Sequence, residues 1–441
     1  MKLYKALRFI CLAVFVTAPL PLFGADATMK LSLADALSRA REQNYTVKAA
    51  RSRIAQAEGQ ITQSRQSLLP KVTLSETFMV TNDPGAALVY KLQHNTIEQS
   101  DFMPSKLNNA DVIDDFHTSV QVMQPIYNAD AKKGRSMALV AKKGQEFMAE
   151  RTAETIALHV SKAYYGLLLA RKNSEAIDGS LAIMQGYNAE TARGFNVGML
   201  SRSDKLSTEV RLAELQEQKM MMEDEIKNAT DALRVLLNLD PTVTIVPTTD
   251  LNVDGSMPSV KDGGALEQRS DLQAMEVFRQ VASLQAEMAD ASRLPRVNAF
   301  AQGNLHGATP LEGGSSWALG VNVQWNILDA KVSEGQMQEA KAKKLEAMYS
   351  YEAAKSSGTA EINRALRSLK TAKARLAIAS KSLEGAKVSF DHIGKQYKTG
   401  MAMTMELLMR EQAFTYAKMR LNQAAFDYNV AKSELEYYKG N

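Results

Sequence analysis

Two pairs of long helices dominate the pattern of apolar and polar positions. From 129 to about 194 the sequence contains no proline, and Ala, Lys, Glu, Leu and Gln, which favour helix, prevail. About 65 residues at about 1.5 Å each predict a rod near 100 Å long. After a break at 196–198 helix resumes to 239, and the same pair of helices recurs at 330–397 and 404–438. A further helix is expected from 33 to 69, ended by Pro70.

The last of these helices carries a heptad repeat of apolar residues. Such a repeat predicts packing against neighbouring helices with coiled-coil geometry. Its members recur every seven residues: Leu407, Phe414, Leu421, Tyr428 and Leu435.

Four segments alternate with period two and therefore predict β-strands: 71–81, 116–126, 296–304 and 316–327. The last has Ser, Ala, Gly, Asn and Gln on one face and large apolar residues on the other. Eight residues tilted by about 40° rise roughly 20 Å, which approximates the apolar band of an outer-membrane barrel. The alternative is a soluble antiparallel sheet with helices over one face. The apolar face is bracketed by the only two tryptophans of the chain and consists of Trp317, Leu319, Val321, Val323 and Trp325.

The chain is one unit written twice. Residues 120–128 align without gaps over 321–329, and the turn at 195–199 aligns over 397–401. Each unit has the order helix, strand, strand, long helix, turn, long helix. The sequence thus predicts a first repeat at 28–239 and a second at 264–441, joined by a linker at 240–263 that is rich in turn formers.

Residues 1–27 have the three-part pattern of a secretory signal peptide. Lys2, Lys5 and Arg8 precede an apolar run, and the segment ends in the small-x-small sequence at 25–27. An uncleaved membrane anchor is the alternative, but the apolar run is short for a hydrocarbon core of about 30 Å. Cys11, the only cysteine, lies inside this segment, so the exported chain is expected to contain none.

Composition excludes several classes of protein. A chain of 441 residues that is 45% hydrophobic with a net charge of +4 is not disordered, and it offers no electrostatic reason to bind nucleic acid. After the N-terminal segment no run of 18 apolar residues occurs, so a membrane location would require a closed β-barrel. Four strands cannot close one, since the smallest such barrels need about eight. Several chains must therefore pool their strands in an obligate homo-oligomer.

These features together resemble the TolC family of outer-membrane efflux proteins. The resemblance rests on the duplicated unit, the Leu-Pro strand entries at Pro70 and Pro295, the strand exit at 124–127 and the turn at 195–198. It implies a mainly α fold with a membrane β-barrel portion, in which a homotrimer forms a twelve-stranded barrel and an α-helical tunnel. It also implies an outer-membrane duct with a periplasmic extension. The expected partners are a periplasmic adaptor (membrane fusion) protein and an inner-membrane pump of RND or ABC type.

The resemblance also implies a gate just after each turn glycine. Glu406 matches the family's acidic aperture ring, and Asp204 stands at the equivalent place in the first repeat. Tyr397 matches a latch tyrosine expected to hydrogen-bond Asp204, with Ser203 beside it. Three converging carboxylates would favour cations. The alternative is that Asp204 and Glu406 are solvated acids at helix starts, favoured by the helix dipole.

Two positions depart from the family pattern. Ala402 stands where the family has a latch arginine, and Met409 replaces a second aperture carboxylate. Trp317, Trp325 and Phe116 are the expected membrane-interface anchors. The residues that match the adaptor-docking tips are Val197, Gly198, Met199, Leu200, Ser201, Thr399, Gly400, Met401 and Ala402.

The remaining candidates for chemistry are weak. Methionines cluster at 401–409 and 220–222; thioethers suit Cu(I), but helix packing or an adaptable docking surface is favoured. The five histidines show no ligand spacing, and no catalytic motif is present, so no enzyme activity, cofactor or metal is predicted. The long polar segment 82–115 is expected to be an extracellular loop. A secreted coiled-coil structural or adhesion protein without a channel remains the alternative function.

Overall fold

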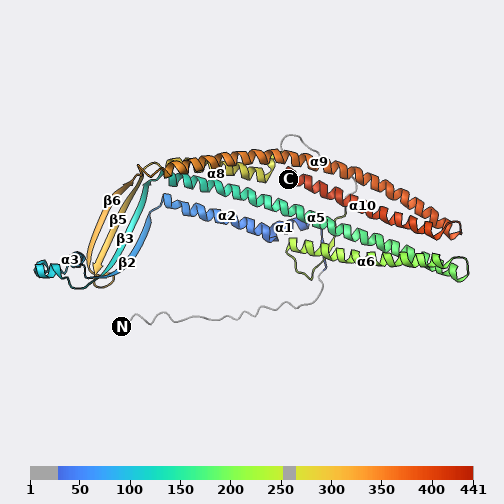
Figure 1. Cartoon of the computed structure of the whole chain (residues 1–441), viewed down its shortest axis with the longest axis horizontal. Coiled ribbons are helices and arrows are strands. Elements are labelled where there is room, and N and C mark those ends of the chain that lie inside the picture. The colour runs from blue at the N-terminus through green and yellow to red at the C-terminus, as the bar shows by residue number, and fades with distance from the viewer. Residues whose placement is uncertain (1–27, 252–264, 441) are drawn as a thin grey trace, which may run out of the picture.

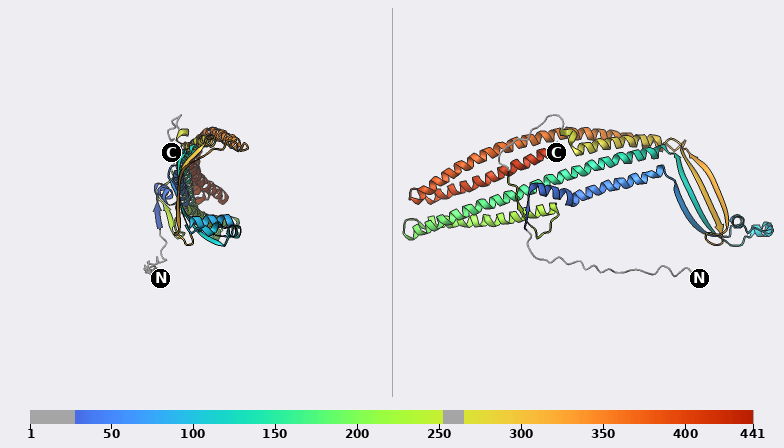
Figure 2. Two further views of the ribbon diagram at one scale, coloured as in Figure 1. Left: turned by 90° about the vertical axis from the view of Figure 1, so that its left-hand side faces the viewer. Right: turned by 180° about the vertical axis from the view of Figure 1, so that it is seen from behind.

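The computed structural model describes residues 28–251 and 265–440, so the predicted signal peptide lies outside the described residues. The molecule is elongated. A β-sheet lies towards one end, and the two tight connections between paired helices lie at the other (Figure 1). Long helices run between them. Seen along its length the molecule is thin and curved rather than a closed bundle (Figure 2).

Four helices form the part farthest from the sheet. α5 (Ala129–Asn196) and α6 (Arg202–Leu237) make one antiparallel hairpin, and α9 (Val332–Lys398) and α10 (Thr404–Lys439) make the second. Their bounds agree with the predicted helices to within a few residues. The heptad of α10 faces the core, since its Leu407, Tyr428 and Leu435 are fully buried.

Shorter helices continue the layer towards the sheet. α8 (Ser270–Ala291) lies between α9 and α5, and α2 (Tyr45–Ser64) lies on the other side of α5; the four-residue α7 (Ala265–Gln268) precedes α8. In order across the molecule the helices are α9, α10, α5 and α6 at the turns, and α9, α8, α5 and α2 near the sheet (Figure 1). α9 therefore forms one lateral edge, and α6 with α2 forms the other.

The helix predicted over 33–69 is broken. α1 (Leu33–Gln43) ends at Asn44, which has extended backbone angles and begins α2. Its side-chain oxygen accepts the backbone N–H of Thr46 at 2.8 Å and of Val47 at 3.3 Å. This N-cap stabilises a helix start in the middle of the segment, which the apolar pattern alone does not reveal. A 3₁₀ turn, η1 (Arg65–Ser67), follows α2.

The sheet is antiparallel with the order β2-β3-β5-β6. Its strands are β2 (Lys71–Thr81), β3 (Ile113–Tyr127), β5 (Arg296–Gly307) and β6 (Gly314–Gln324). The prediction for the last strand was wrong at its end, because β6 stops at Gln324. Trp325 lies beyond it and donates its ring N–H to the Arg293 carbonyl at 3.0 Å. Among the described residues, both edge strands, β2 and β6, keep one free edge in the single chain.

The segment predicted as a long loop is partly helical. Between β2 and β3 the chain forms α3 (Pro84–Gln93), the 3₁₀ turn η2 (Gln99–Phe102) and α4 (Pro104–Asn108). Asp83 and Pro84 start α3, since Asp83 accepts the Ala86 N–H at 2.8 Å and proline is favourable in a first helical turn. None of the described helices combines the length and apolarity needed to cross a bilayer.

A small parallel sheet lies midway along the helices. β1 (Thr28–Leu31) pairs with β4 (Thr244–Pro247), which belongs to the linker between the repeats. The fully buried Tyr164 of α5 donates its hydroxyl proton to the Leu31 carbonyl at 2.9 Å and accepts the Thr249 N–H at 2.9 Å. The largest apolar cluster of the molecule surrounds this tyrosine, so the linker is tied to the core of both hairpins.

Candidate functional site

The two helix-to-helix turns have the same backbone geometry. Gly198 and Gly400 have φ of 76° and 75°, the left-handed region that glycine enters without strain. The N–H that follows each glycine reaches back to close the helix: Met199 bonds the Gly194 carbonyl at 2.8 Å, and Met401 bonds the Gln396 carbonyl at 2.9 Å. These are Schellman closures, so the duplicated sequence gives a duplicated turn.

The predicted docking residues divide into exposed and packed side chains. Val197, Met199 and Met401 are 70%, 81% and 72% exposed at the extreme end of the molecule. Leu200, in contrast, lies against Gly194, and Ala402 packs against the buried cluster around Phe390 and Leu407. The Thr399 hydroxyl donates to the Gln396 carbonyl at 3.0 Å, and Ser201 caps α6. The end therefore presents apolar side chains from both turns.

Asp204 forms a capping box with Ser201 at the start of α6. Its carboxylate accepts the Ser201 hydroxyl at 2.6 Å and the Ser201 N–H at 3.0 Å, while the Ser201 hydroxyl accepts the Asp204 N–H. The donated Ser201 hydroxyl lowers the pKa of the Asp204 carboxyl. The Thr404 hydroxyl of α10 is buried and has no hydrogen-bond partner within the described part of the chain. Asp204 is thus a half-buried, ionised cap, with exposed Ser203 next to it.

The predicted hydrogen bond from Tyr397 to Asp204 was wrong. Tyr397 lies in the last turn of α9 and is buried, and its hydroxyl lies 2.7 Å from the Thr191 hydroxyl of α5. Since Thr191 donates its own proton to the Tyr187 carbonyl at 2.9 Å, Tyr397 is the donor. The ring of Tyr397 also meets Tyr187 edge-on, with centroids 5.8 Å apart. Tyr397 therefore links the two hairpins through α5 rather than through Asp204 of α6.

Glu406 lies in the first turn of α10. It is half-buried and, in the part of the chain that the structure describes, makes no ion pair within 4.0 Å. Met409 follows almost one turn later and is 56% exposed, as are Met403 and Met405 at 79% and 58%. A carboxylate and several thioethers therefore share the exposed start of this helix.

A buried ion pair that sequence reasoning missed lies farther from the turns. Arg211 of α6 donates its Nε proton to Glu411 of α10 at 2.8 Å, and the Glu411 side chain is 1% exposed. Thr415 donates to the second oxygen of this carboxylate at 2.7 Å and also contacts Ser180 of α5. Three helices from both repeats meet here. One signal was available, since Glu411 follows Leu407 by one helical turn, on the apolar face of the heptad.

The sheet has one apolar and one polar face, as the alternation predicted. Leu74 of β2 pairs with Val120 of β3, Val120 pairs with Gly303 of β5, and Gly303 pairs with Trp317 of β6, so these positions share the apolar face. Its side chains stay exposed in the single chain: Leu74 is 68% and Trp317 83% exposed. A soluble sheet covered by helices would bury them, so that alternative is wrong.

Aromatic anchors and polar neighbours complete the two faces. Phe116 contacts Phe78 on the apolar face, with ring centroids 4.6 Å apart. On the opposite face Gln302 donates to Ser119 at 3.2 Å and to Asn304 at 2.9 Å. The apolar face therefore suits lipid, and the polar face suits water.

Three of the five histidines gather at the end of the sheet that is remote from the long helices, beside α3. The buried Asp115 carboxylate accepts a ring N–H from His94 at 2.9 Å and from His306 at 3.0 Å. His117 stacks on His306 with ring centroids 4.1 Å apart. No group of three or more His, Cys, Asp or Glu side chains among residues 28–251 and 265–440 is arranged to hold a metal ion. The cluster instead fastens α3 to the sheet, and sequence spacing gave no sign of it.

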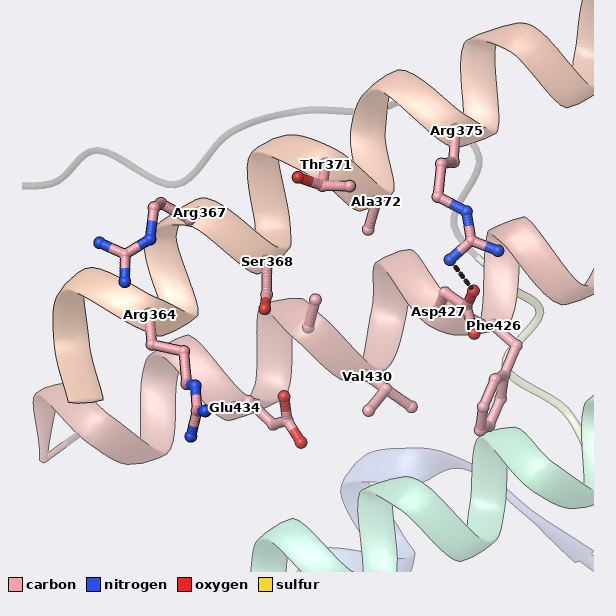
Figure 3. Close-up of a pocket in the computed structure, with 11 residues that line it drawn as sticks. Arg364, Arg367, Ser368, Thr371, Ala372, Arg375, Phe426, Asp427, Val430 and Glu434 are labelled. Atoms are coloured by element: carbon pink, nitrogen blue, oxygen red, sulfur yellow. Dashed lines mark ion pairs between the residues drawn. The ribbon is translucent and has the colours of Figure 1, made fainter. Parts of the chain in front are cut away.

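An open groove of about 550 Å³ lies between α9 and α10 (Figure 3). Arg375 pairs with Asp427 across it at 3.0 Å, and Arg364 and Arg367 stand at its other end. Its two carboxylates are both in ion pairs, Asp427 with Arg375 and Glu434 with Lys162. The groove supplies positive charge along α9 rather than a catalytic arrangement.

Comparison with known proteins agrees with this architecture. The family model described as "Outer membrane efflux protein" matches residues 36–239 and 263–441. A sequence comparison with curated proteins gives no significant match.

Among solved structures, VceC from Vibrio cholerae is 16% identical with a TM-score of 0.77, covering 93% of this chain and 96% of its own. CmeC from Campylobacter jejuni is 17% identical with a TM-score of 0.77, covering 92% and 85%. The open state of MtrE from Neisseria gonorrhoeae is 16% identical with a TM-score of 0.75, covering 93% and 89%. At these identities the likeness concerns the fold.

Proposed function

Since this chain belongs to the outer membrane efflux protein family, we propose that it forms the outer-membrane exit duct of a tripartite efflux or type I secretion system. The observation that carries the proposal is the exposed apolar face of a four-stranded sheet whose other face is polar. A surface of this kind is stable against lipid on one side and water on the other.

The duct requires more than one copy of the chain. Four strands leave the edges of β2 and β6 unpaired, and unpaired edges in hydrocarbon are costly. Pairing β6 of one copy with β2 of the next is a head-to-tail contact, which closes into a ring. A homotrimer would supply twelve strands for a barrel, and the helices of the three copies would continue it as a tunnel.

The exposed turns are the proposed site for a periplasmic adaptor (membrane fusion) protein. Both present methionine side chains that are more than two-thirds exposed, Met199 and Met401. Methionine adapts its shape to a partner and is common at binding surfaces. Through the adaptor the duct would meet an inner-membrane pump of RND or ABC type, which supplies the energy, while the duct conducts passively and without catalysis. The N-terminal signal pattern favours export, and the proposed destination is the outer membrane of a Gram-negative cell.

The proposed aperture is a ring of Glu406 side chains, one from each copy. Glu406 has no compensating cation within 4.0 Å in the described part of its own chain. Several carboxylates around a narrow axis would attract cations and repel anions.

Replacing Glu406 with glutamine is therefore expected to bring the cation-to-anion permeability ratio of the channel close to one. The reversal potential of purified protein in a planar bilayer under a KCl gradient measures this ratio. Glu384→Gln removes an exposed carboxylate from α9 and serves as the control, which should keep the wild-type ratio. An unchanged ratio in the Glu406 variant would remove this residue from the aperture.

A further inference from the structure

The lateral edges of the helical layer carry opposite charges. α9 forms one edge and α6 the other, at opposite sides of the molecule near the turns (Figure 1). The exposed surface of α9 between 364 and 387 has a single acidic residue, Glu384. Its seven basic residues are all exposed: Arg364, Arg367, Lys370, Lys373, Arg375, Lys381 and Lys387.

Most of this positive charge has no partner within the chain. Among the described residues, only Arg375 of the seven makes an ion pair, with Asp427. Arg364 and Arg367 line the groove beside α10 (Figure 3). Like charges along one helix repel one another, so this row favours an acidic partner.

The exposed surface of α6 supplies the opposite charge. Between 209 and 231 this helix has only three basic residues, and its seven acidic residues are all exposed. Within the described chain, Glu217, Glu223 and Glu225 make no ion pair within 4.0 Å. The seven are Glu209, Glu214, Glu217, Glu223, Asp224, Glu225 and Asp231.

The basic residues of α9 and the acidic residues of α6 lie at matching distances along their helices from the turns. Lys381 precedes the turn glycine of α9 by as many positions as Glu217 follows the turn glycine of α6. Lys373 and Glu225 are likewise equally far along the chain from their own turn glycines. Since every helical residue rises about 1.5 Å, equal counts give nearly equal heights. Copies related by rotation about the duct axis share a common height, so opposite charges would meet.

Exposed apolar residues of α9 and α6 also lie at equal distances from their turn glycines. Ile378 of α9 and Met220 of α6, which are 60% and 62% exposed, are equally far along the chain from their turn glycines. Val388 and Val210, which are 65% and 58% exposed, form a second equidistant pair nearer the turns. An apolar seam flanked by opposite charges is the usual composition of a contact between two helices of a coiled coil.

We propose that α9 of one copy docks along α6 of the next copy, and that this charged seam sets the register in which the ring closes. The inference rests on the proposed function, which requires several copies around one axis. The apolar residues supply contact area, while complementary charge guides association and disfavours shifted registers.

Cysteine cross-linking of the full chain tests the register directly. Ile378→Cys combined with Met220→Cys should yield covalent dimers and trimers on oxidation, because a disulfide requires Cα atoms within about 7 Å. Within one chain the two positions lie on opposite edges, so a bridge joins two copies. Ile378→Cys with Leu206→Cys, which is about 21 Å out of register along α6, is the matched control, together with each single variant. No cross-linking of the matched pair, or equal cross-linking of the control pair, overturns the proposal.

Charge reversal separates this inference from the proposed function. Lys373→Glu with Lys381→Glu should lower the assembled fraction at low ionic strength about tenfold, and adding Glu217→Lys with Glu225→Lys should restore it. If the wild type assembles and conducts while the reversed variant assembles equally well, the seam is wrong and the duct stands. If the wild type remains a monomer that does not conduct, both are wrong.

Discussion

Replacing Glu411 with alanine is expected to destabilise the helical end of the molecule by about 3–5 kcal/mol. The change leaves Arg211 buried without its partner on α10, and it removes the acceptor of the Thr415 hydroxyl. Arg211 keeps only the half-exposed Glu214, and the loss of a buried partner costs more than most single substitutions do. Because α5, α6 and α10 meet at this pair, the loss should open the contact between the two hairpins.

Hydrogen exchange of the intact protein measures this effect locally. Backbone amides of α6 and α10 around the pair should exchange about two to three orders of magnitude faster than in the wild type. Glu214→Ala is the matched control, because Glu214 bonds the same arginine but its side chain is 50% exposed, and such pairs contribute little. Arg211→Met with Glu411→Leu should recover most of the protection. Equal exchange in the Glu411 and Glu214 variants would contradict a special role for the buried pair.

Introducing a charge on the apolar face of β6 is expected to prevent membrane integration. Leu319 is 74% exposed on this face, and an arginine facing the bilayer midplane costs about 2–4 kcal/mol in each copy. Because every copy carries the substitution, the penalty is multiplied in the assembled ring. The Leu319→Arg variant should therefore be lost from the outer-membrane fraction or become extractable at high pH.

The neighbouring residue provides the control for this prediction. Ala318 pairs with Gln302 on the polar face, so Ala318→Arg should integrate as the wild type does. Cell fractionation followed by alkaline extraction distinguishes the two variants. Equal integration of both, or equal loss of both, would mean that the two faces of the sheet do not differ in their surroundings.

Much of the architecture could be predicted because the sequence pattern occurs twice and its apolar positions are strongly periodic. The long helices follow from proline-free stretches of helix-forming residues, and the strands follow from alternation that holds on four segments. The turns follow from Gly198 and Gly400, which alone among the residues of their turns take left-handed angles. Such local signals need no knowledge of what each residue contacts.

The parts that could not be predicted depend on long-range contacts. Asn44 breaks a helix through its own side chain, and the short strands β1 and β4 come from the start of the first repeat and from the linker that follows it. Tyr397 bonds Thr191 of α5 rather than Asp204 of α6, and this choice of partner depends on how the two hairpins pack together. The periodicity of apolar residues indicates neither the helix break, nor the strand pairing, nor the hydrogen-bond partner.

Buried polar groups were missed for a related reason. The Arg211–Glu411 pair and the contact of His306 with Asp115 each join a segment of the first repeat to one of the second. The spacing of residues along the chain does not predict side-chain contacts between distant segments. The one usable clue was a charged residue, Glu411, on the apolar face of the α10 heptad.

Single-channel recording tests the central claim, that several copies of this chain close into a duct across a bilayer. The purified full-length protein, added to a planar lipid bilayer, is predicted to give discrete current steps of uniform size with preference for cations. The Leu319→Arg variant at the same concentration should give none. Wild-type protein that is folded, yet produces no steps, would contradict the account.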